Sequence, residues 1–179
     1  MNSTQGALLG LLRRGPATAH QLARQAAQEI GNYWSVTRSQ VYRELTALAG
    51  QGLVSTSGAT GSGGRREYAL TEPGRQAFLG WLAAEPEPEH LRVPLLLRLT
   101  FIDDLEPGQL QRLLDSQRAA HSARLEEYQA SLDGWRAQAA PERYLLPLAY
   151  GIRYEQAVLD WFAELPDLPG SAKGSDDRT

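Results

Sequence analysis

Apolar residues near the N-terminus follow two short helical patterns, each bounded by a strong start or stop signal. The first is a leucine-rich segment at positions 8, 9, 11 and 12 that ends at Gly15 and Pro16, a pair that stops a helix. The second begins at Thr18, which can form a capping box with Gln21, because each side chain can bond the backbone of the other residue. Its apolar positions at i, i+4 and i+8 are Leu22, Ala26 and Ile30.

A third helix is predicted from a repeat of this capping pattern, with Thr37 as the cap and Gln40 as its partner. Its apolar stripe consists of Val41, Leu45 and Leu48. Because this stripe must pack on the first two helices, the polar residues of the first two turns face outward. The sequence therefore predicts a helix with one buried face and one exposed polar face.

A short β-hairpin should follow the third helix. The strand candidates are residues 53–54 and 68–70, and the segment between them has glycine at positions 58, 61, 63 and 64. A glycine-rich loop can lie close to a sugar-phosphate backbone, and Arg65 and Arg66 follow it directly. A fourth helix is predicted from Thr71 through Leu82.

Beyond residue 92 the pattern is helical throughout. A short apolar segment at 93–102 precedes a long helix from Glu106 to roughly Ala139, and another helix runs from Pro141 to about Leu165. The long helix carries a seam near a seven-residue repeat that is apolar at both ends and polar in the middle. Since these two helices have broad apolar faces and no strands to cover them, we expect them to complete their burial against a second copy of the chain.

The order of these elements predicts a mainly α-helical protein with a small two-stranded β-wing. In this fold class a winged helix-turn-helix domain is followed by an α-helical dimerisation domain. An acidic, proline-interrupted stretch after the fourth helix marks the boundary. The predicted parts are a winged helix-turn-helix DNA-binding domain at 1–84, a linker at 85–92, a helical dimerisation domain at 93–165 and a disordered tail at 166–179.

Charge is divided unevenly between the two halves of the 179-residue chain. The net charge is -3 overall, but residues 1–80 carry eight arginines against four glutamates, and residues 81–179 carry ten basic against seventeen acidic groups. If the partner is a nucleic acid, its phosphates would therefore contact the positive half, residues 1–80. Arginine suits that role because its planar fork pairs with phosphate and with guanine edges.

Several classes of protein are excluded by what the sequence lacks. There is no run of about 18 apolar residues that would span a membrane, and no N-terminal export pattern, so a cytoplasmic protein is expected. With no cysteine and three histidines in separate segments, neither a metal site nor a cofactor is predicted. No Gly-x-Ser-x-Gly motif or paired acid and base occurs, so we do not expect an enzyme.

Double-stranded DNA is the partner that the positive half favours. An exposed helix with Arg, Ser, Gln and Tyr near its N-terminus suits the major groove, and arginines at the wing would neutralise phosphates. The predicted DNA-binding residues are Thr37, Arg38, Ser39, Gln40, Tyr42, Arg43, Arg65 and Arg66. The alternative is a winged-helix protein-protein interaction module without DNA binding, which the sequence pI of 5.6 favours.

The N-terminal half resembles the PadR family of bacterial transcriptional regulators. The residues that carry the resemblance are Leu8 to Leu12, Gly15 and Pro16, Tyr33 to Ser35, Gln40 to Tyr42, Leu48, Gly52 to Val54, and Gly64 to Gly74. The resemblance implies a homodimeric repressor that binds an inverted-repeat operator, with the C-terminal helices and the first helix at the interface. The corresponding interface residues here are Leu8, Leu12, Leu114, His121, Tyr128, Leu148, Ile152 and Leu159.

Aromatic residues in both halves raise the question of a small-molecule effector. Tyr33 and Trp34 precede the third helix, and Trp135 and Tyr154 lie in the helical half. They could line an apolar pocket for a small aromatic or cationic effector. The other interpretation is that they are core and interface packing. A ligand of this kind would act by preferring one placement of the DNA-binding domains.

Overall fold

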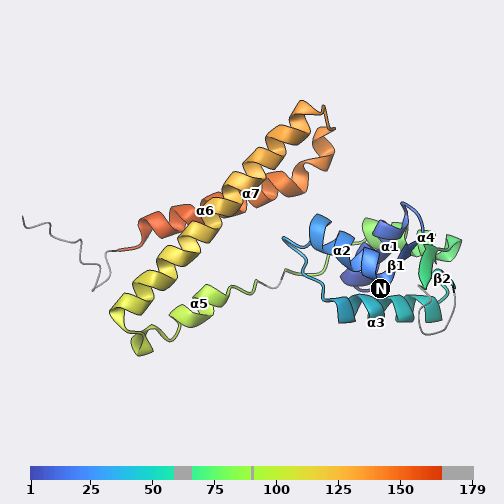
Figure 1. Cartoon of the computed structure of the whole chain (residues 1–179), viewed down its shortest axis with the longest axis horizontal. Coiled ribbons are helices and arrows are strands. Elements are labelled where there is room, and N and C mark those ends of the chain that lie inside the picture. Colours follow the sequence, from blue (N-terminus) through green and yellow to red (C-terminus); the bar gives the residue numbers. More distant parts are fainter. Residues whose placement is uncertain (59–65, 90, 167–179) are drawn as a thin grey trace, which may run out of the picture. The chain divides into compact units, whose positions relative to one another are not determined.

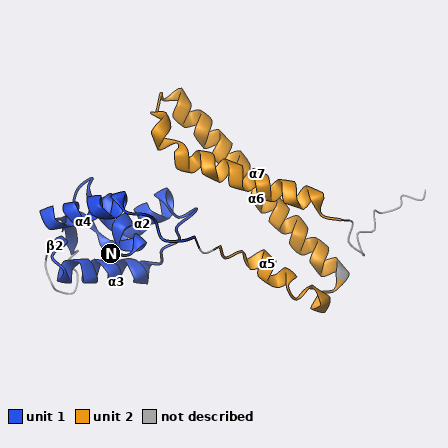
Figure 2. Cartoon of the chain, turned by 180° about the vertical axis from the view of Figure 1, so that it is seen from behind, with its two compact units in different colours: residues 1–89 blue, residues 90–179 orange. Residues whose placement is uncertain are grey.

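The computed structural model describes residues 1–58, 66–89 and 91–166. The chain forms two compact units, residues 1–89 and residues 90–179, and the boundary between them falls within the segment predicted as a linker (Figure 2). The wing glycines at 61, 63 and 64 and the predicted tail after Pro166 lie outside the described residues. Within the described residues, no helix is both long and apolar enough to cross a membrane.

Unit 1 contains the predicted helices and hairpin strands in the expected order, together with one short strand that the sequence did not predict (Figure 1). Its elements are α1 (Ser3–Leu12), β1 (Ala17–Thr18), α2 (Ala19–Glu29), α3 (Arg38–Gly50), β2 (Val54–Ser57), β3 (Glu67–Leu70) and α4 (Glu72–Ala83). The sheet is antiparallel with strand order β1-β3-β2, so the predicted two-stranded wing is corrected to three strands. β1 pairs Ala17 with Tyr68, and two residues are too few to give a sequence pattern.

The apolar stripe of α3 is fully buried, as its spacing predicts. Val41, Leu45 and Leu48 have no exposed surface, and they pack with leucines of α1 and α2 in one core. Burying a leucine or valine side chain contributes about 1.5 to 3 kcal/mol, so this stripe is a main source of the stability of unit 1. Packing on one face fixes which residues of α3 face outward.

Threonine caps begin three of the helices of unit 1. Both predicted capping boxes are confirmed: the backbone nitrogen of Thr37 donates to Gln40 Oε1 at 2.8 Å, and Thr18 and Gln21 form the same pair at 2.8 Å. Thr71 caps α4 by accepting from the backbone nitrogen of Gly74 at 3.1 Å. A cap of this kind stabilises a helix by about 1 kcal/mol and fixes the residue at which it starts.

The base of the hairpin is tied to the end of α3 through Gly52. Gly52 has φ of 71°, and the backbone nitrogen of Leu53 donates to Leu48 O at 3.0 Å, which closes the helix as a Schellman motif. The Thr71 hydroxyl then donates to the carbonyl of Leu53 at 2.9 Å. A Cβ at Gly74 would lie 1.9 Å from that same carbonyl oxygen, so only glycine fits at this junction.

Unit 2 is a helical hairpin preceded by a short helix. Its elements are α5 (Pro94–Leu99), η1 (Ile102–Asp104), α6 (Pro107–Ala137), η2 (Glu142–Tyr144) and α7 (Leu146–Glu164). The long helix α6 agrees with the sequence prediction, but α7 starts at Leu146 and not at Pro141. Pro147 explains the difference, because proline is tolerated in the first turn of a helix and breaks it further in.

The predicted seam of α6 packs against α7 of the same chain, and its polar middle has a partner. Glu155 of α7 has 3% of its side chain exposed. His121 Nδ1 lies 2.5 Å from Glu155 Oε2, and Arg124 Nη1 donates to Glu155 Oε1 at 3.2 Å. The His121, Arg124 and Glu155 side chains thus form a polar layer between two apolar layers of the hairpin.

Four residues of the predicted dimer interface are buried within their own units. Leu8 and Leu12 lie in the core of unit 1, and Leu114 and Tyr128 are buried within unit 2. These four side chains are covered by their own chain and leave little surface for a second copy. The sequence pattern identifies them correctly as apolar and inward-facing, but periodicity does not tell which surface covers them.

Replacing Glu155 by alanine should destabilise unit 2. The change leaves His121 and Arg124 without their shared carboxylate, and removing one partner of a buried pair costs 3 to 5 kcal/mol in other proteins. Because the Arg124 side chain can reach water, we expect a smaller loss of about 2 to 3 kcal/mol in the free energy of unfolding. Denaturant unfolding followed by circular dichroism measures it.

Gln156→Ala is the matched control, since Gln156 is the exposed neighbour of Glu155 on α7. It should change the free energy of unfolding by less than about 0.5 kcal/mol. Equal losses for the two variants would mean that the polar layer contributes nothing beyond helix propensity.

Candidate nucleic-acid interface

The outward face of α3 gathers most of the predicted DNA-binding residues. Arg38, Ser39, Tyr42 and Arg43 are all exposed; Ser39, Tyr42 and Arg43 lie away from the buried stripe of the same helix, and Arg38 flanks it at the first residue of the helix. The spacing of three and four residues places them side by side along about two turns. Thr46 is also exposed, one turn further along α3, and is not among the residues predicted from the sequence.

Thr37 and Gln40 have a structural task at the start of the helix. Gln40 Oε1 accepts from both the backbone nitrogen and the hydroxyl of Thr37, at 2.8 and 3.0 Å. The Thr37 hydroxyl also lies 3.0 Å from that of Ser39. These bonds satisfy the helix start and leave the Gln40 amide group as a donor toward the outside. Thr37 and Gln40 are therefore engaged in hydrogen bonds within the protein as well as being part of the predicted DNA-binding set.

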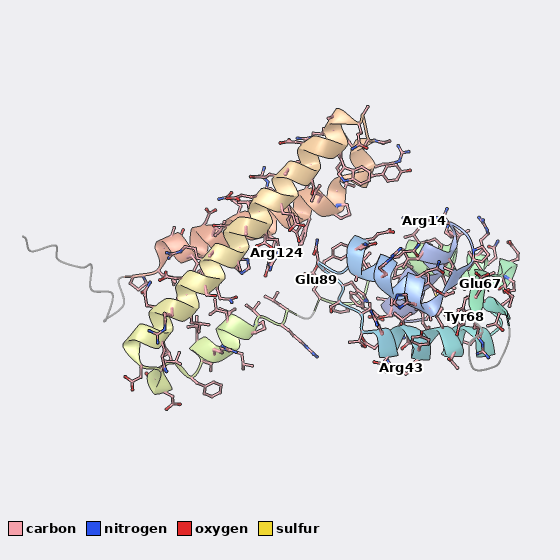
Figure 3. All side chains as sticks on the ribbon, viewed as in Figure 1. Arg14, Arg43, Glu67, Tyr68, Glu89 and Arg124 are labelled. Atoms are coloured by element: carbon pink, nitrogen blue, oxygen red, sulfur yellow. The ribbon has the colours of Figure 1, made fainter. Side chains whose placement is uncertain are left out.

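Of the two wing arginines predicted to contact DNA, the structure describes one. Arg66 is exposed and stands immediately before β3, whereas Arg65 lies outside the described residues. β3 is anchored by Tyr68, whose ring is buried in the core of unit 1, and Glu67 is exposed beside it (Figure 3). Anchoring at Tyr68 fixes the point at which the basic segment leaves the sheet.

Glu44 is a buried carboxylate on α3 that the sequence analysis overlooks. Its Oε1 accepts from Arg43 Nε and Nη2 at 3.2 and 3.0 Å, and its Oε2 accepts from Gln5 Nε2 at 3.0 Å and Asn2 Nδ2 at 3.3 Å. A signal exists in the sequence: position 44 lies on the same helix face as Val41 and Leu48, where a charge requires partners.

The environment of Glu44 favours its charged form. Burial disfavours the carboxylate, but hydrogen bonds from Arg43, Asn2 and Gln5, together with the charge of Arg43, more than offset burial. The pKa of Glu44 is consequently lowered from its ordinary value of 4.5. The group is therefore a carboxylate at neutral pH and holds a fixed negative charge next to Arg43.

The four predicted effector residues are exposed in their own units and do not belong to a protomer's core. Trp34 donates from Nε1 to the Thr4 hydroxyl at 3.2 Å, and burial and the charge of Glu29 raise the pKa of Tyr33. In unit 2, Trp135 lies near the end of α6, while Tyr154 precedes the Glu155 layer.

An open cavity of about 470 Å³ lies in unit 2. Its lining is contributed by α5, η1 and α6 and consists of Arg98, Phe101, Asp104, Leu105, Gln109 and Leu113. The surface is mostly apolar with one charge of each sign at its edge. None of the residues that the sequence analysis assigns to an effector lines this cavity.

Comparison with known protein families identifies both halves of the chain. The model described as "Transcriptional regulator PadR-like family" matches residues 8–79, and the model described as "Virulence activator alpha C-term" matches residues 91–167. The first match spans the helices and hairpin of unit 1 up to α4. The second spans nearly all of unit 2.

Similar proteins agree with this assignment. The chain is 32% identical over 170 residues to the negative transcriptional regulator PadR of Bacillus subtilis, covering 89% of this chain and 93% of the relative. The crystal structure of that PadR with operator DNA has a TM-score of 0.73 at 25% identity and covers 90% of this chain and 96% of that chain. Its structure with p-coumaric acid gives a TM-score of 0.65 at 27% identity, covering 89% and 90%.

Fold and matches together define the class of protein as a winged-helix transcriptional regulator. The chain belongs to the PadR family, as the resemblance of its N-terminal half implies. This family and the similar proteins regulate transcription and are not enzymes, which confirms the prediction that the chain has no catalytic role.

Proposed function

We propose that this protein is a homodimeric repressor that binds an inverted-repeat operator in double-stranded DNA through α3 and the wing. The observation that carries the proposal is the exposed polar face of α3, held outward by a stripe with no exposed surface. A helix presented in this way fits the major groove. The structure of Bacillus subtilis PadR with operator DNA supports the proposal at 25% identity.

The residues divide between reading bases and holding the DNA backbone. Arg38, Ser39, Tyr42 and Arg43 face outward from the first two turns of α3 and would reach base edges. The start of α3, with Thr37 and the Gln40 amide, and the wing arginines Arg65 and Arg66 would contact phosphates. Two copies related by a two-fold axis would place their recognition helices about 34 Å apart, one helical turn of DNA.

Alanine at Arg38 and at Arg66 should weaken binding in different ways. Arg38→Ala should lower the preference for operator over scrambled duplex, because a base contact is lost, by roughly 5- to 100-fold. Arg66→Ala should weaken binding to both duplexes and flatten the salt dependence by about 1 unit, because a phosphate contact is lost. Fluorescence anisotropy between about 50 and 200 mM salt measures both.

The same titration distinguishes DNA binding from the alternative, a winged-helix module that holds another protein. A DNA-binding dimer with about 6 to 10 phosphate contacts loses 10³- to 10⁵-fold in affinity over this range of salt. A module that binds proteins would give no duplex binding at low salt. Identical effects of the two alanine variants on both duplexes would contradict the division between base and phosphate contacts.

Self-association is supported by apolar surface on unit 2. α7 exposes Leu146, Tyr150 and Tyr154 at intervals of four residues, so they form a stripe on the side away from Glu155 and Phe162. Leu148, Ile152 and Leu159, from the predicted interface, are partly exposed but lie on the face of α7 that carries Glu155 and Phe162, and His121 is engaged with Glu155. We infer that this stripe is covered by a second copy of the chain, since exposed apolar patches mark contact sites.

Tyr150→Glu should dissociate the dimer, because it places a carboxylate in the middle of the stripe. Sedimentation at micromolar concentration should show the mass of a dimer for the natural chain and a shift toward the protomer for the variant. Gln129→Glu, on an exposed position of α6, adds the same charge elsewhere and should remain dimeric. A natural chain that sediments as a lone protomer would contradict the proposed dimer.

A small aromatic effector is the second part of the proposal. Bacillus subtilis PadR has been crystallised with p-coumaric acid, a small aromatic carboxylic acid. In this chain Tyr33, Trp34, Trp135 and Tyr154 offer exposed aromatic surface that a small aromatic or cationic compound could stack on. A ligand can release DNA only if it binds the DNA-free arrangement more tightly than the bound one.

Binding of such a compound should quench tryptophan fluorescence and weaken operator binding over the same range of concentration. Trp34→Phe and Trp135→Phe, tested singly, identify which tryptophan reports the binding. Quenching without any change in operator affinity would identify a ligand that is not an effector. p-Coumaric acid, which is aromatic and not cationic, and an aliphatic quaternary ammonium compound, which is cationic and not aromatic, are the two probes that separate the alternatives.

A further inference from the structure

Arg43 and Glu44 form an ion pair that is anchored to a different helix. Glu44 has 11% of its side chain exposed and Arg43 has 68%, so the carboxylate is inside and the guanidinium outside. The second carboxylate oxygen is held by Gln5 and Asn2 at the start of α1. Asn2 is itself fixed, because its Oδ1 accepts from the backbone nitrogen of Gln5 at 2.8 Å.

Neighbouring residues on a helix do not ordinarily face each other. For Arg43 to bond Glu44, its side chain must fold back along α3, and the bonds of Nε and Nη2 to one oxygen then hold it there (Figure 3 labels Arg43). A long side chain restrained in this way loses less conformational entropy on binding a ligand than a mobile one. The pair therefore pre-organises an exposed arginine on the outward face of α3.

The bonds to Glu44 leave a defined set of donors available. A guanidinium has five N–H donors in a planar fork, and Glu44 takes one at Nε and one at Nη2. The outer edge, formed by Nη1 and the remaining Nη2 hydrogen, has the geometry that pairs with two acceptors at once. Guanine O6 and N7 in the major groove are such a pair.

The charge of Glu44 decides whether guanine or phosphate is the better partner for the outer edge of the Arg43 guanidinium. The Glu44 carboxylate cancels most of the positive charge of Arg43 at close range and would repel a phosphate. A guanine edge is uncharged, so it gains the two hydrogen bonds without that repulsion. The arrangement thus favours a base and disfavours the backbone.

We propose that Arg43 reads a guanine in the operator and that Glu44 is the positioning residue that presents it. This inference rests on the proposed function, in which α3 enters the major groove. It assigns a task in specificity to a buried carboxylate that touches no DNA itself. It also links the start of α1 to the DNA-reading face through Asn2 and Gln5.

Selection of bound duplexes from a random library, followed by anisotropy on the selected and a scrambled duplex, tests the proposal. The variants are Arg43→Ala, which removes the fork, Glu44→Gln, which keeps the shape of the side chain without its charge, and Glu44→Asp, which keeps the charge but shortens the reach. Glu29→Gln is the matched control, because Glu29 also pairs with an arginine, Arg14, and is not part of α3. Thermal melts establish that each variant is folded.

Arg43→Ala and both Glu44 variants should lose preference for guanine at the same position of each half-site, by roughly 5- to 100-fold for the alanine variant. Glu44→Gln should in addition bind the scrambled duplex more tightly and with a steeper salt dependence, because it uncovers the charge of Arg43. Glu44→Asp should lose preference without that gain. Glu29→Gln should keep the preference of the natural chain.

Three outcomes would overturn the proposal. If Arg43→Ala weakens all duplexes alike and flattens the salt dependence by about 1 unit, Arg43 contacts phosphate. If the folded Glu44 variants keep the guanine preference that Arg43→Ala loses, Glu44 does not position Arg43. If the natural chain selects a sequence and Arg43→Ala selects the same one, this inference fails alone, whereas a natural chain that selects no sequence removes the proposed function as well.

Discussion

Burial of one face of α3 is the constraint on which the rest of unit 1 depends. Val41, Leu45 and Leu48 have no exposed surface, and a helix packed so completely cannot rotate about its axis without opening cavities in the core. The polar residues on the other face of α3 therefore point outward in a fixed orientation. The threonine cap and the Gly52 turn then fix where the helix begins and ends, so the outward face has a defined length as well as a defined direction.

Features encoded by neighbouring residues could be predicted from the sequence. The helices follow from apolar spacing, and the Thr18 and Thr37 capping boxes follow from two side chains three residues apart, which bond each other in any helix start. The exposed face of α3 follows from its buried stripe by geometry alone. Pro147 marks the late start of α7, because proline is tolerated in the first turn of a helix and breaks it further in.

Features that depend on distant segments could not be predicted. Glu44 is held by residues 39 and 42 positions away in the chain, and Glu155 by residues 31 and 34 positions away. A single sequence gives no indication of which polar residues will meet across such separations. The same limit applies to Leu8 and Leu12, whose apolar character is evident from the sequence while the surface that covers them is not. It also explains why β1 was not predicted, because its two residues form a strand only by pairing with β3.

The polar layer around Glu155 determines how the two long helices of unit 2 align. An apolar seam alone would tolerate sliding by one turn, since leucine meets leucine again after each shift. Sliding α7 by a turn would carry the Glu155 carboxylate away from both its nitrogen donors, and a buried carboxylate without its donors is costly. A single acidic residue thus selects one register of the hairpin, much as a buried asparagine does in a coiled coil, and a rod with one register transmits displacement at one end faithfully to the other.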